Sequence, residues 1–174
     1  MKNILITGSN GFIARELIRR LKEYPSYNLL EMTRERLDVT KSDEVDKFFD
    51  MYHIDYVIHT AIGGGRRNTI DSPDVFYNNL IMFENLIKHR GKYECMITFG
   101  SGAERDRTKN IMELSETDFE IHNNEIPQDY YGFSKYLINE KIRFINDNIL
   151  NLRIFNVFGE LEAENRMIKN NVNN

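Results

Sequence analysis

Tyr131 and Lys135 are two residues whose types and spacing could carry out chemistry. They lie four residues apart in the run Tyr-Gly-Phe-Ser-Lys, so a helix would place both side chains on one face. A free tyrosine has a pKa of about 10 and is a poor base near neutral pH. A nearby ammonium favours the tyrosinate, and the phenol can then exchange a proton with a substrate hydroxyl. The pair therefore predicts a proton-transfer site, provided that the segment is helical.

A glycine-rich turn near the N-terminus could bind phosphate. Residues 7–11 (Thr-Gly-Ser-Asn-Gly) follow a short apolar run and precede an amphipathic one. Gly8 allows the chain to turn sharply, and Gly11 allows the backbone to approach a pyrophosphate at the positive end of the following helix. A tight turn without a ligand is the alternative. The position of the turn between a strand and a helix favours a dinucleotide site.

The elements that must position these residues follow from the hydrophobic pattern. Apolar runs alternate with longer amphipathic segments, which predicts a parallel sheet with helices on both faces. Strands are expected at residues 4–6, 28–33, 36–39, 56–61, 95–99 and 150–157. Helices are expected at residues 12–21, from 40 onward with Thr40 and Asp43 as a capping box, at 72–90, and after Pro127 as far as residue 145. Residues 104–125 predict a long surface loop, and residues 160–174 predict no packed element. The fold class is therefore α/β, a doubly wound parallel sheet of the Rossmann type with three αβα layers.

The glycine turn and a second run near the end of the chain resemble motifs of a known family. The run from Thr7 to Ala14 resembles the TGxxGFIG motif of the extended short-chain dehydrogenases/reductases, the family of NAD-dependent epimerases and dehydratases. Ala14 replaces the last glycine of that motif, a position that mainly serves close helix–strand packing. The run from Leu152 to Gly159 is similar to the LRxFNvyG segment of the family, so the resemblance covers residues 1–159. Within the family, residues 32–38 and the triple-glycine loop at 63–65 look most like the GDP-L-fucose synthase subfamily.

The resemblance implies a function and a set of site residues. It implies hydride transfer between NAD(P) and a carbon of a nucleotide sugar, with Tyr131 as acid/base and Lys135 in support. Epimerases, dehydratases and reductases share this step, so the sequence does not separate them. Asn156 would face the nucleotide-sugar substrate. The cofactor-binding residues implied are Gly8, Asn10, Gly11, Phe12, Ile13, Arg34, Asp38, Val39, Thr60, Ala61, Ile62, Asn79, Tyr131 and Lys135.

The third catalytic group of the family is a hydroxyl that follows the preceding strand. An alignment without gaps places Gly102 at that position, where no hydroxyl exists. Ser101 supplies the hydroxyl if the loop is shifted by one residue. Capping of the turn is the alternative role for Ser101.

The choice of cofactor depends on the end of the second strand. An acidic residue there grips the ribose 2′-hydroxyl of NAD, whereas arginine suits the 2′-phosphate of NADP. Arg34 favours NADP, Glu35 is the contrary sign, and NAD stays the alternative. Arg66 and Arg67 could meet substrate phosphates, or they could form a solvated pair in the loop.

Composition limits the remaining classes. The net charge of −4 argues against a nucleic-acid binder, which needs a basic face. The single cysteine, Cys95, cannot form an internal disulfide, and no apolar run reaches the length of a membrane helix, so a cytoplasmic protein is expected. The four histidines lack metal-ligand spacing, so no metal site is predicted.

The expected organisation is a Rossmann domain at residues 1–159 and a polar tail, or the start of a truncated substrate domain, at 160–174. The family places a substrate domain after the Rossmann core, so we expect an incomplete substrate pocket. A non-catalytic NAD(P)-binding module is the alternative function. A homodimer is implied by resemblance, because helices around Asn79 and Tyr131 pair between subunits in this family.

Overall fold

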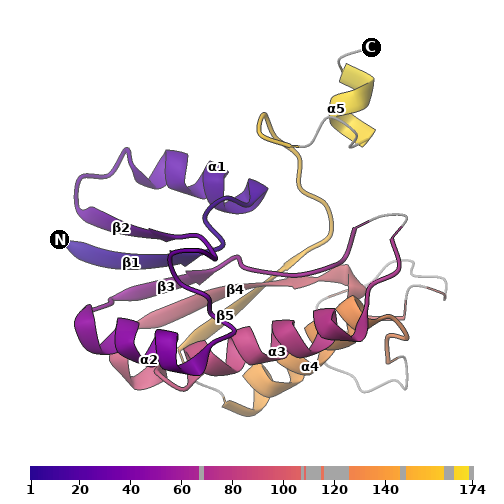
Figure 1. Cartoon of the computed structure of the whole chain (residues 1–174). Helices are drawn as coiled ribbons and strands as arrows, with labels where there is room; N and C mark the ends of the chain where they lie inside the picture. The colour runs from indigo at the N-terminus through magenta and orange to yellow at the C-terminus, as the bar shows by residue number, and fades with distance from the viewer. Residues whose placement is uncertain are drawn as a thin grey trace.

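The described part of the chain forms a five-stranded parallel sheet with helices on both of its faces (Figure 1). The computed structural model describes residues 1–66, 69–106, 108, 115, 126–145, 148–162 and 167–172. The elements are β1 (Lys2–Thr7), α1 (Phe12–Leu21), β2 (Tyr27–Met32), α2 (Ser42–Met51), β3 (Tyr56–His59), α3 (Pro73–Ile87), η1 (Arg90–Lys92), β4 (Cys95–Ser101), η2 (Gly102–Glu104), α4 (Tyr130–Ile145), β5 (Ile149–Ile154) and α5 (Met167–Val172). The predicted α/β Rossmann-type fold is confirmed.

The strand order defines where a ligand can enter. The order is β2-β1-β3-β4-β5, so the chain leaves β1 toward one edge and returns through β3 on the other side. Helix α1 lies on one face of the sheet, and α2, α3 and α4 cover the opposite face (Figure 1). In parallel sheets a crevice opens at the carboxyl ends of the strands where the order reverses, here between β1 and β3.

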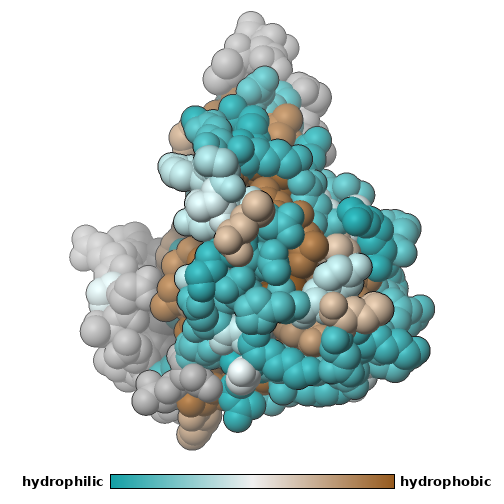
Figure 2. Space-filling model, turned by 90° about the vertical axis from the view of Figure 1, so that its left-hand side faces the viewer, coloured by the Kyte–Doolittle hydropathy of each residue, from teal (hydrophilic) through white to brown (hydrophobic). Residues whose placement is uncertain are grey.

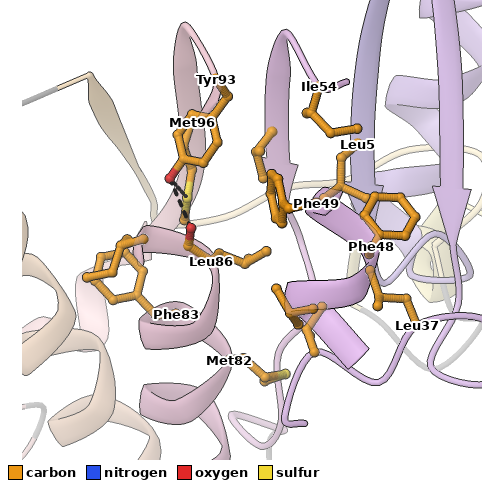
Figure 3. Packing of buried hydrophobic residues seen from close by; sticks show 14 of the residues in the cluster. Leu5, Leu37, Phe48, Phe49, Ile54, Met82, Phe83, Leu86, Tyr93 and Met96 are labelled. Atoms are coloured by element: carbon orange, nitrogen blue, oxygen red, sulfur yellow. Dashed lines mark hydrogen bonds between the residues drawn. The ribbon is translucent and has the colours of Figure 1, made fainter. Parts of the chain in front are cut away.

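Two apolar clusters fix the sheet between its helix layers. The larger one joins strand residues such as Leu5 and Met96 to Phe49 of α2 and Phe83 of α3 (Figure 3). The smaller one packs Ala14 and other residues of α1 against the opposite face of β1 and β3. Each large apolar side chain removed from water contributes about 1.5–3 kcal/mol. Ala14 is fully buried, so its methyl group fits between α1 and the sheet where the family motif has glycine.

The outer surface is mostly hydrophilic on the side that faces left in Figure 1, with apolar residues gathered near its centre (Figure 2). Within the described residues, no helix combines the length and the apolar composition needed to cross a membrane.

The expected strand at residues 36–39 is wrong. The backbone N–H groups of Arg36 and Leu37 both donate to the Thr33 carbonyl, at 3.2 and 3.0 Å, and this closes a turn. The side chains of Leu37 and Val39 are buried in the larger cluster. Their alternation in the sequence therefore reflects two core contacts made from turns and not a strand.

The capping box at Thr40 and Asp43 is also wrong. Helix α2 begins at Ser42, its N-cap residue is Lys41, and no side chain caps it. The Thr40 hydroxyl donates instead to Asp38 Oδ1 at 2.7 Å.

The C-terminal elements differ from expectation in two ways. The last strand ends at Ile154 and does not continue to residue 157. Residues 160–174 were expected to hold no packed element, but residues 167–172 form α5. Lys169 of this helix donates to the carbonyls of Glu160 and Glu162, at 2.8 and 2.9 Å, which ties α5 to the preceding turn.

Candidate functional site

A pocket of about 430 Å³ opens at the carboxyl ends of β1, β2 and β3. It lies at the reversal of strand order, where the topology predicts a ligand crevice. Nine residues expected to bind a cofactor line it: Gly8, Asn10, Gly11, Arg34, Asp38, Val39, Thr60, Ala61 and Ile62. The residues expected from the sequence to bind a cofactor at the ends of β1, β2 and β3 therefore lie together around one cavity.

The glycine turn is held firmly between two strands. Gly8 has a φ of +66°, a conformation that favours glycine. The Ser9 N–H donates to the Met32 carbonyl at the end of β2, and the Thr60 hydroxyl donates to the Thr7 carbonyl at 2.6 Å. The turn therefore presents its backbone at the start of α1 in a fixed position, as binding of a diphosphate requires.

Arg34 lies at the edge of the pocket and is paired within it. Its Nε lies 3.4 Å from Asp38 Oδ2, and its side chain is 75% exposed. Burial raises the pKa of Asp38, but hydrogen bonds from Thr40 and the charge of Arg34 outweigh burial and hold this pKa below its usual range. A hydrogen bond from Thr33 likewise lowers the pKa of Glu35. The pocket therefore holds one exposed guanidinium beside two ionised carboxylates.

Asn79 of α3 is only 1% exposed and contacts Gly63, one of the residues that line the pocket. Its amide brackets the backbone of Gly63, accepting from the N–H at 2.8 Å and donating to the carbonyl at 3.1 Å. It also donates to the Ser134 hydroxyl at 3.1 Å, and that hydroxyl donates to the Tyr131 carbonyl at 2.7 Å. One side chain of α3 thus joins the triple-glycine loop to the first turn of α4.

The triple-glycine loop lies directly against the ring of Tyr131. A Cβ added at Gly65 would stand 2.9 Å from both Cε2 and Cζ of that ring. Gly65 has a φ of +72°, and its N–H donates to Asp71 Oδ2 at 3.0 Å. The close approach of backbone to ring therefore depends on glycine at this position.

The substitution Gly65→Ala is expected to lower the free energy of unfolding by about 1–2 kcal/mol, because it adds backbone strain and displaces the Tyr131 ring. Gly63→Ala is the matched control, since its Cβ would meet only Asn79 Oδ1 at an ordinary 3.5 Å. Urea unfolding of both variants measures the difference. Equal stability of the two variants would show that the loop does not rest on the ring.

Lys135 is a buried cation next to Tyr131. It is 7% exposed, its Nζ donates to the Phe99 carbonyl, and it lies 5.9 Å from the centroid of the Tyr131 ring. Burial lowers the pKa of Lys135 to about 8, against the opposing effect of Glu104. Burial and the Lys135 charge lower the pKa of His59 to about 3. His59 is therefore neutral, and its Nδ1 lies 2.8 Å from the Thr7 hydroxyl.

Ser101 ends β4 and caps the short helix η2. Its Oγ accepts from the Ala103 N–H at 3.1 Å, and the Glu104 carboxylate accepts from the Ser101 N–H. At Gly102 a Cβ would stand 2.7 Å from the ring of Phe155, which is 64% exposed. The capping role considered for Ser101 is thus present in the structure.

Four other expected site residues lie outside the main pocket. Phe12 and Ile13 line a second cavity of about 350 Å³, between α1 and residues 157–160. Asn156 is exposed in the segment after β5, and Arg66 is exposed in the loop after β3. Arg67 lies outside the described residues. No group of three or more potential metal ligands occurs within the described ranges.

Seven residues that line the main pocket are absent from the cofactor-binding residues expected from the sequence: Thr33, Glu35, Leu37, Thr40, Gly63, Asn78 and Met82. Glu35 was considered only as the contrary sign in the choice of cofactor. Of the seven, Asn78 and Met82 are four residues apart in α3. Their helical spacing beside Asn79 could have indicated that this part of the helix faces the glycine turn.

The chain belongs to the NAD dependent epimerase/dehydratase family, whose profile matches residues 4–174. It is 30% identical over 104 residues to GDP-L-fucose synthase from Sinorhizobium fredii (strain NBRC 101917 / NGR234), which covers 58% of this chain and 33% of that protein. Among solved structures, it is similar to a GDP-D-glycero-L-gluco-heptose synthase from Campylobacter jejuni in the presence of NADPH, with a TM-score of 0.75 and 23% identity over 90% of this chain and 48% of that one.

A second solved relative is a GDP-L-fucose synthetase from Naegleria fowleri bound to NADP. Its TM-score is 0.70 at 20% identity, over 94% of this chain and 56% of that one. The chain thus spans a third of the curated relative and about half of each solved relative.

Proposed function

We propose that the chain binds NADP(H) in the pocket at the ends of β1–β3 and contributes the cofactor half of an enzyme that acts on nucleotide sugars. The observation that carries the proposal is the continuity of the site. The pocket runs from Arg34 past the glycine turn to Gly63, and Asn79 links Gly63 to the helix of Tyr131 and Lys135. Relatives whose names include GDP-L-fucose synthase support the substrate class, and those solved with NADP or NADPH support the cofactor.

The residues fit a dinucleotide along this path. Backbone N–H groups of the turn from Gly8 to Gly11 would hold the diphosphate, and Arg34 the 2′-phosphate. The pocket wall formed by Asp38 and Val39 would contact the adenine side. When bound, the nicotinamide supplies the hydride acceptor or donor.

Side chains of α4 would carry out the proton transfer of the proposed reaction. Tyr131 would take the proton of a sugar hydroxyl when the carbinol is oxidised, or return it when the ketone is reduced. The Lys135 ammonium favours the tyrosinate, and the Ser101 hydroxyl would donate to the reacting oxygen while its own oxygen caps η2. Asn156 would face the nucleotide sugar from the segment after β5.

One observation favours a second function, a non-catalytic NAD(P)-binding module. Gly102 supplies no hydroxyl at the position where the family has one, and the Phe155 ring fills the space beside it. In that case cofactor binding would persist and Tyr131 would have no effect on any turnover.

The substitution Arg34→Ala is expected to weaken NADPH binding about tenfold and to leave NADH binding almost unchanged, because only NADPH carries the 2′-phosphate. Arg36→Ala is the matched control, since Arg36 donates to the Glu31 carbonyl at 2.8 Å and is absent from the residues that line the pocket. Titration of the three proteins with NADPH and NADH, followed by nicotinamide fluorescence, measures the effect. Failure of the unsubstituted chain to bind either cofactor would refute the proposed function.

A further inference from the structure

A buried ion pair lies beside the site at the ends of β4 and β5. Glu104 Oε2 accepts from Arg153 Nε at 2.8 Å, and the two side chains are only 2% and 8% exposed. Two charges are removed from water here, which is costly unless each finds several partners. A buried pair can fix a particular arrangement of neighbouring groups, and the neighbours of this pair are the proposed catalytic elements.

The pair connects three segments of the site. Glu104 Oε1 accepts from the Ser101 N–H at 2.9 Å, which closes the capping box of η2. The Arg153 guanidinium donates from Nη2 to Asn139 Oδ1 at 3.2 Å, and Asn139 lies one helical turn after Lys135 in α4. The same ion pair thus touches the turn that carries Ser101 and the helix that carries Lys135.

The Glu104 carboxylate occupies space that a side chain at residue 100 would fill. A Cβ at Gly100 would lie 2.3 Å from Glu104 Oε1 and 2.7 Å from Asn151 Oδ1. Gly100 is paired in register with Arg153 across β4 and β5. The absence of a side chain at residue 100 therefore allows the carboxylate to turn back under β4 and to reach the arginine.

Lys135 has few charged neighbours among the described residues. His59 of β3 is neutral, Tyr131 lies on the same helix, and Arg153 of β5 is paired with Glu104. Lys135 Nζ donates to the Phe99 carbonyl, and Glu104 Oε1 lies beside the next residue, Gly100, so the ammonium and the carboxylate approach the same part of β4. Glu104 accordingly raises the pKa of Lys135, in opposition to burial. Burial raises the pKa of Glu104 above its usual range, and Arg153 opposes this rise and so favours the carboxylate.

We propose that Glu104 and Arg153 are positioning residues of the site: Arg153 favours the ionised form of Glu104, and Glu104 both fixes the Ser101 turn and places a carboxylate close to the Lys135 ammonium. The inference deepens the proposed function and rests on it for the roles of Ser101 and Lys135. Its content is an electrostatic coupling between two buried side chains, which can be measured without substrate.

The test follows the ionisation of Lys135 through its ¹⁵Nζ resonance across neutral and alkaline pH, with the signal assigned through Lys135→Arg. In Glu104→Gln, which keeps the shape of the side chain and removes its charge, the apparent pKa of Lys135 is expected to fall by about one pH unit. Glu94→Gln is the matched control. Glu94 lies at the opposite end of β4 and pairs with Lys2, so Lys135 should titrate in this variant as in the unsubstituted chain. An unchanged Lys135 titration in folded Glu104→Gln would overturn the proposal.

Two variants of Arg153 test the same coupling between Glu104 and Lys135 if Glu104→Gln does not fold. Arg153→Met removes the positive charge that favours the Glu104 carboxylate, so the Lys135 pKa is expected to fall as in Glu104→Gln. Arg153→Lys retains the charge and should leave the Lys135 pKa nearly unchanged. Equal Lys135 titrations in these two variants would also overturn the proposal. NADPH titration of the unsubstituted chain is recorded alongside, so that loss of cofactor binding, which counts against the proposed function, is distinguished from absence of the coupling.

Discussion

Replacement of Lys135 by methionine is expected to stabilise the fold at neutral pH by about 2 kcal/mol and to weaken NADPH binding. The ammonium is buried, and a pKa lowered from 10.5 to about 8 means that the folded state holds the charged form at a cost. At about 1.4 kcal/mol for each pKa unit, that cost is on the order of 3 kcal/mol below pH 8. Methionine has a similar length and no charge, so it avoids this cost. The variant also loses the hydrogen bond to the Phe99 carbonyl, which reduces the gain in stability by about 1 kcal/mol.

The stabilising effect of Lys135→Met should depend on pH. Between pH 8 and 10.5 the unfolded chain keeps a proton on Lys135 that the folded chain has released. The unfolded state therefore binds more protons, and the free energy of unfolding of the unsubstituted chain rises with pH across this window. The advantage of Lys135→Met should be largest below pH 8 and should shrink toward zero near pH 10.5.

Urea unfolding of both proteins at neutral pH and near pH 10 measures the two effects. Lys141→Met is the control, because it removes a cation of the same helix that is 42% exposed and pairs with Glu84. A stabilisation by Lys135→Met that is the same at both pH values, or none at all, would mean that the ammonium is not held at a cost. Stability gained with cofactor affinity lost is the expected pattern where a site retains a destabilising charge for function.

The fold and the glycine turn were predictable because local patterns encode them. Short apolar runs such as Ile4–Ile6, separated by amphipathic helices, left few alternatives to a parallel sheet, and Gly8 followed by Gly11 marked the first turn. The same local reasoning was wrong at residues 36–39, where Leu37 and Val39 are apolar because they enter the core from turns. Spacing alone does not distinguish these two causes of alternation.

The buried ion pair was not predictable in the same way. Glu104 begins a polar stretch of the sequence, and charged residues in such stretches are mostly exposed. Its partner Arg153 is 49 residues away, and the close approach also needs the missing side chain at Gly100. Asn79 shows the same limit, since its burial depends on the loop at Gly63 folding back over α3. The ion pair and the burial of Asn79 depend on contacts between segments that are far apart in the sequence. The fold and the glycine turn follow from local sequence patterns.

Gly8→Ala is expected to weaken NADPH binding at least about a hundredfold and to lower the free energy of unfolding by about 3 kcal/mol. The new methyl group would lie 2.7 Å from the Cα and 2.8 Å from the N of Ala61, both backbone atoms, at a residue whose φ is +66°. The hydrogen bond from the Thr60 hydroxyl to the Thr7 carbonyl holds the two segments together, so they cannot separate without a further loss. The turn must therefore move, and with it the N–H groups proposed to hold the diphosphate.

Gly91→Ala is the control for this substitution, because no atom lies within 4 Å of the added methyl group and the residue has no strained φ. Urea unfolding gives the stability of both variants, and NADPH titration at a temperature where each is fully folded separates binding from folding. If folded Gly8→Ala binds NADPH as tightly as Gly91→Ala, the cofactor does not lie on the glycine turn. If it loses binding while it is still folded, the turn is part of the cofactor site, because no other group of the pocket has been changed.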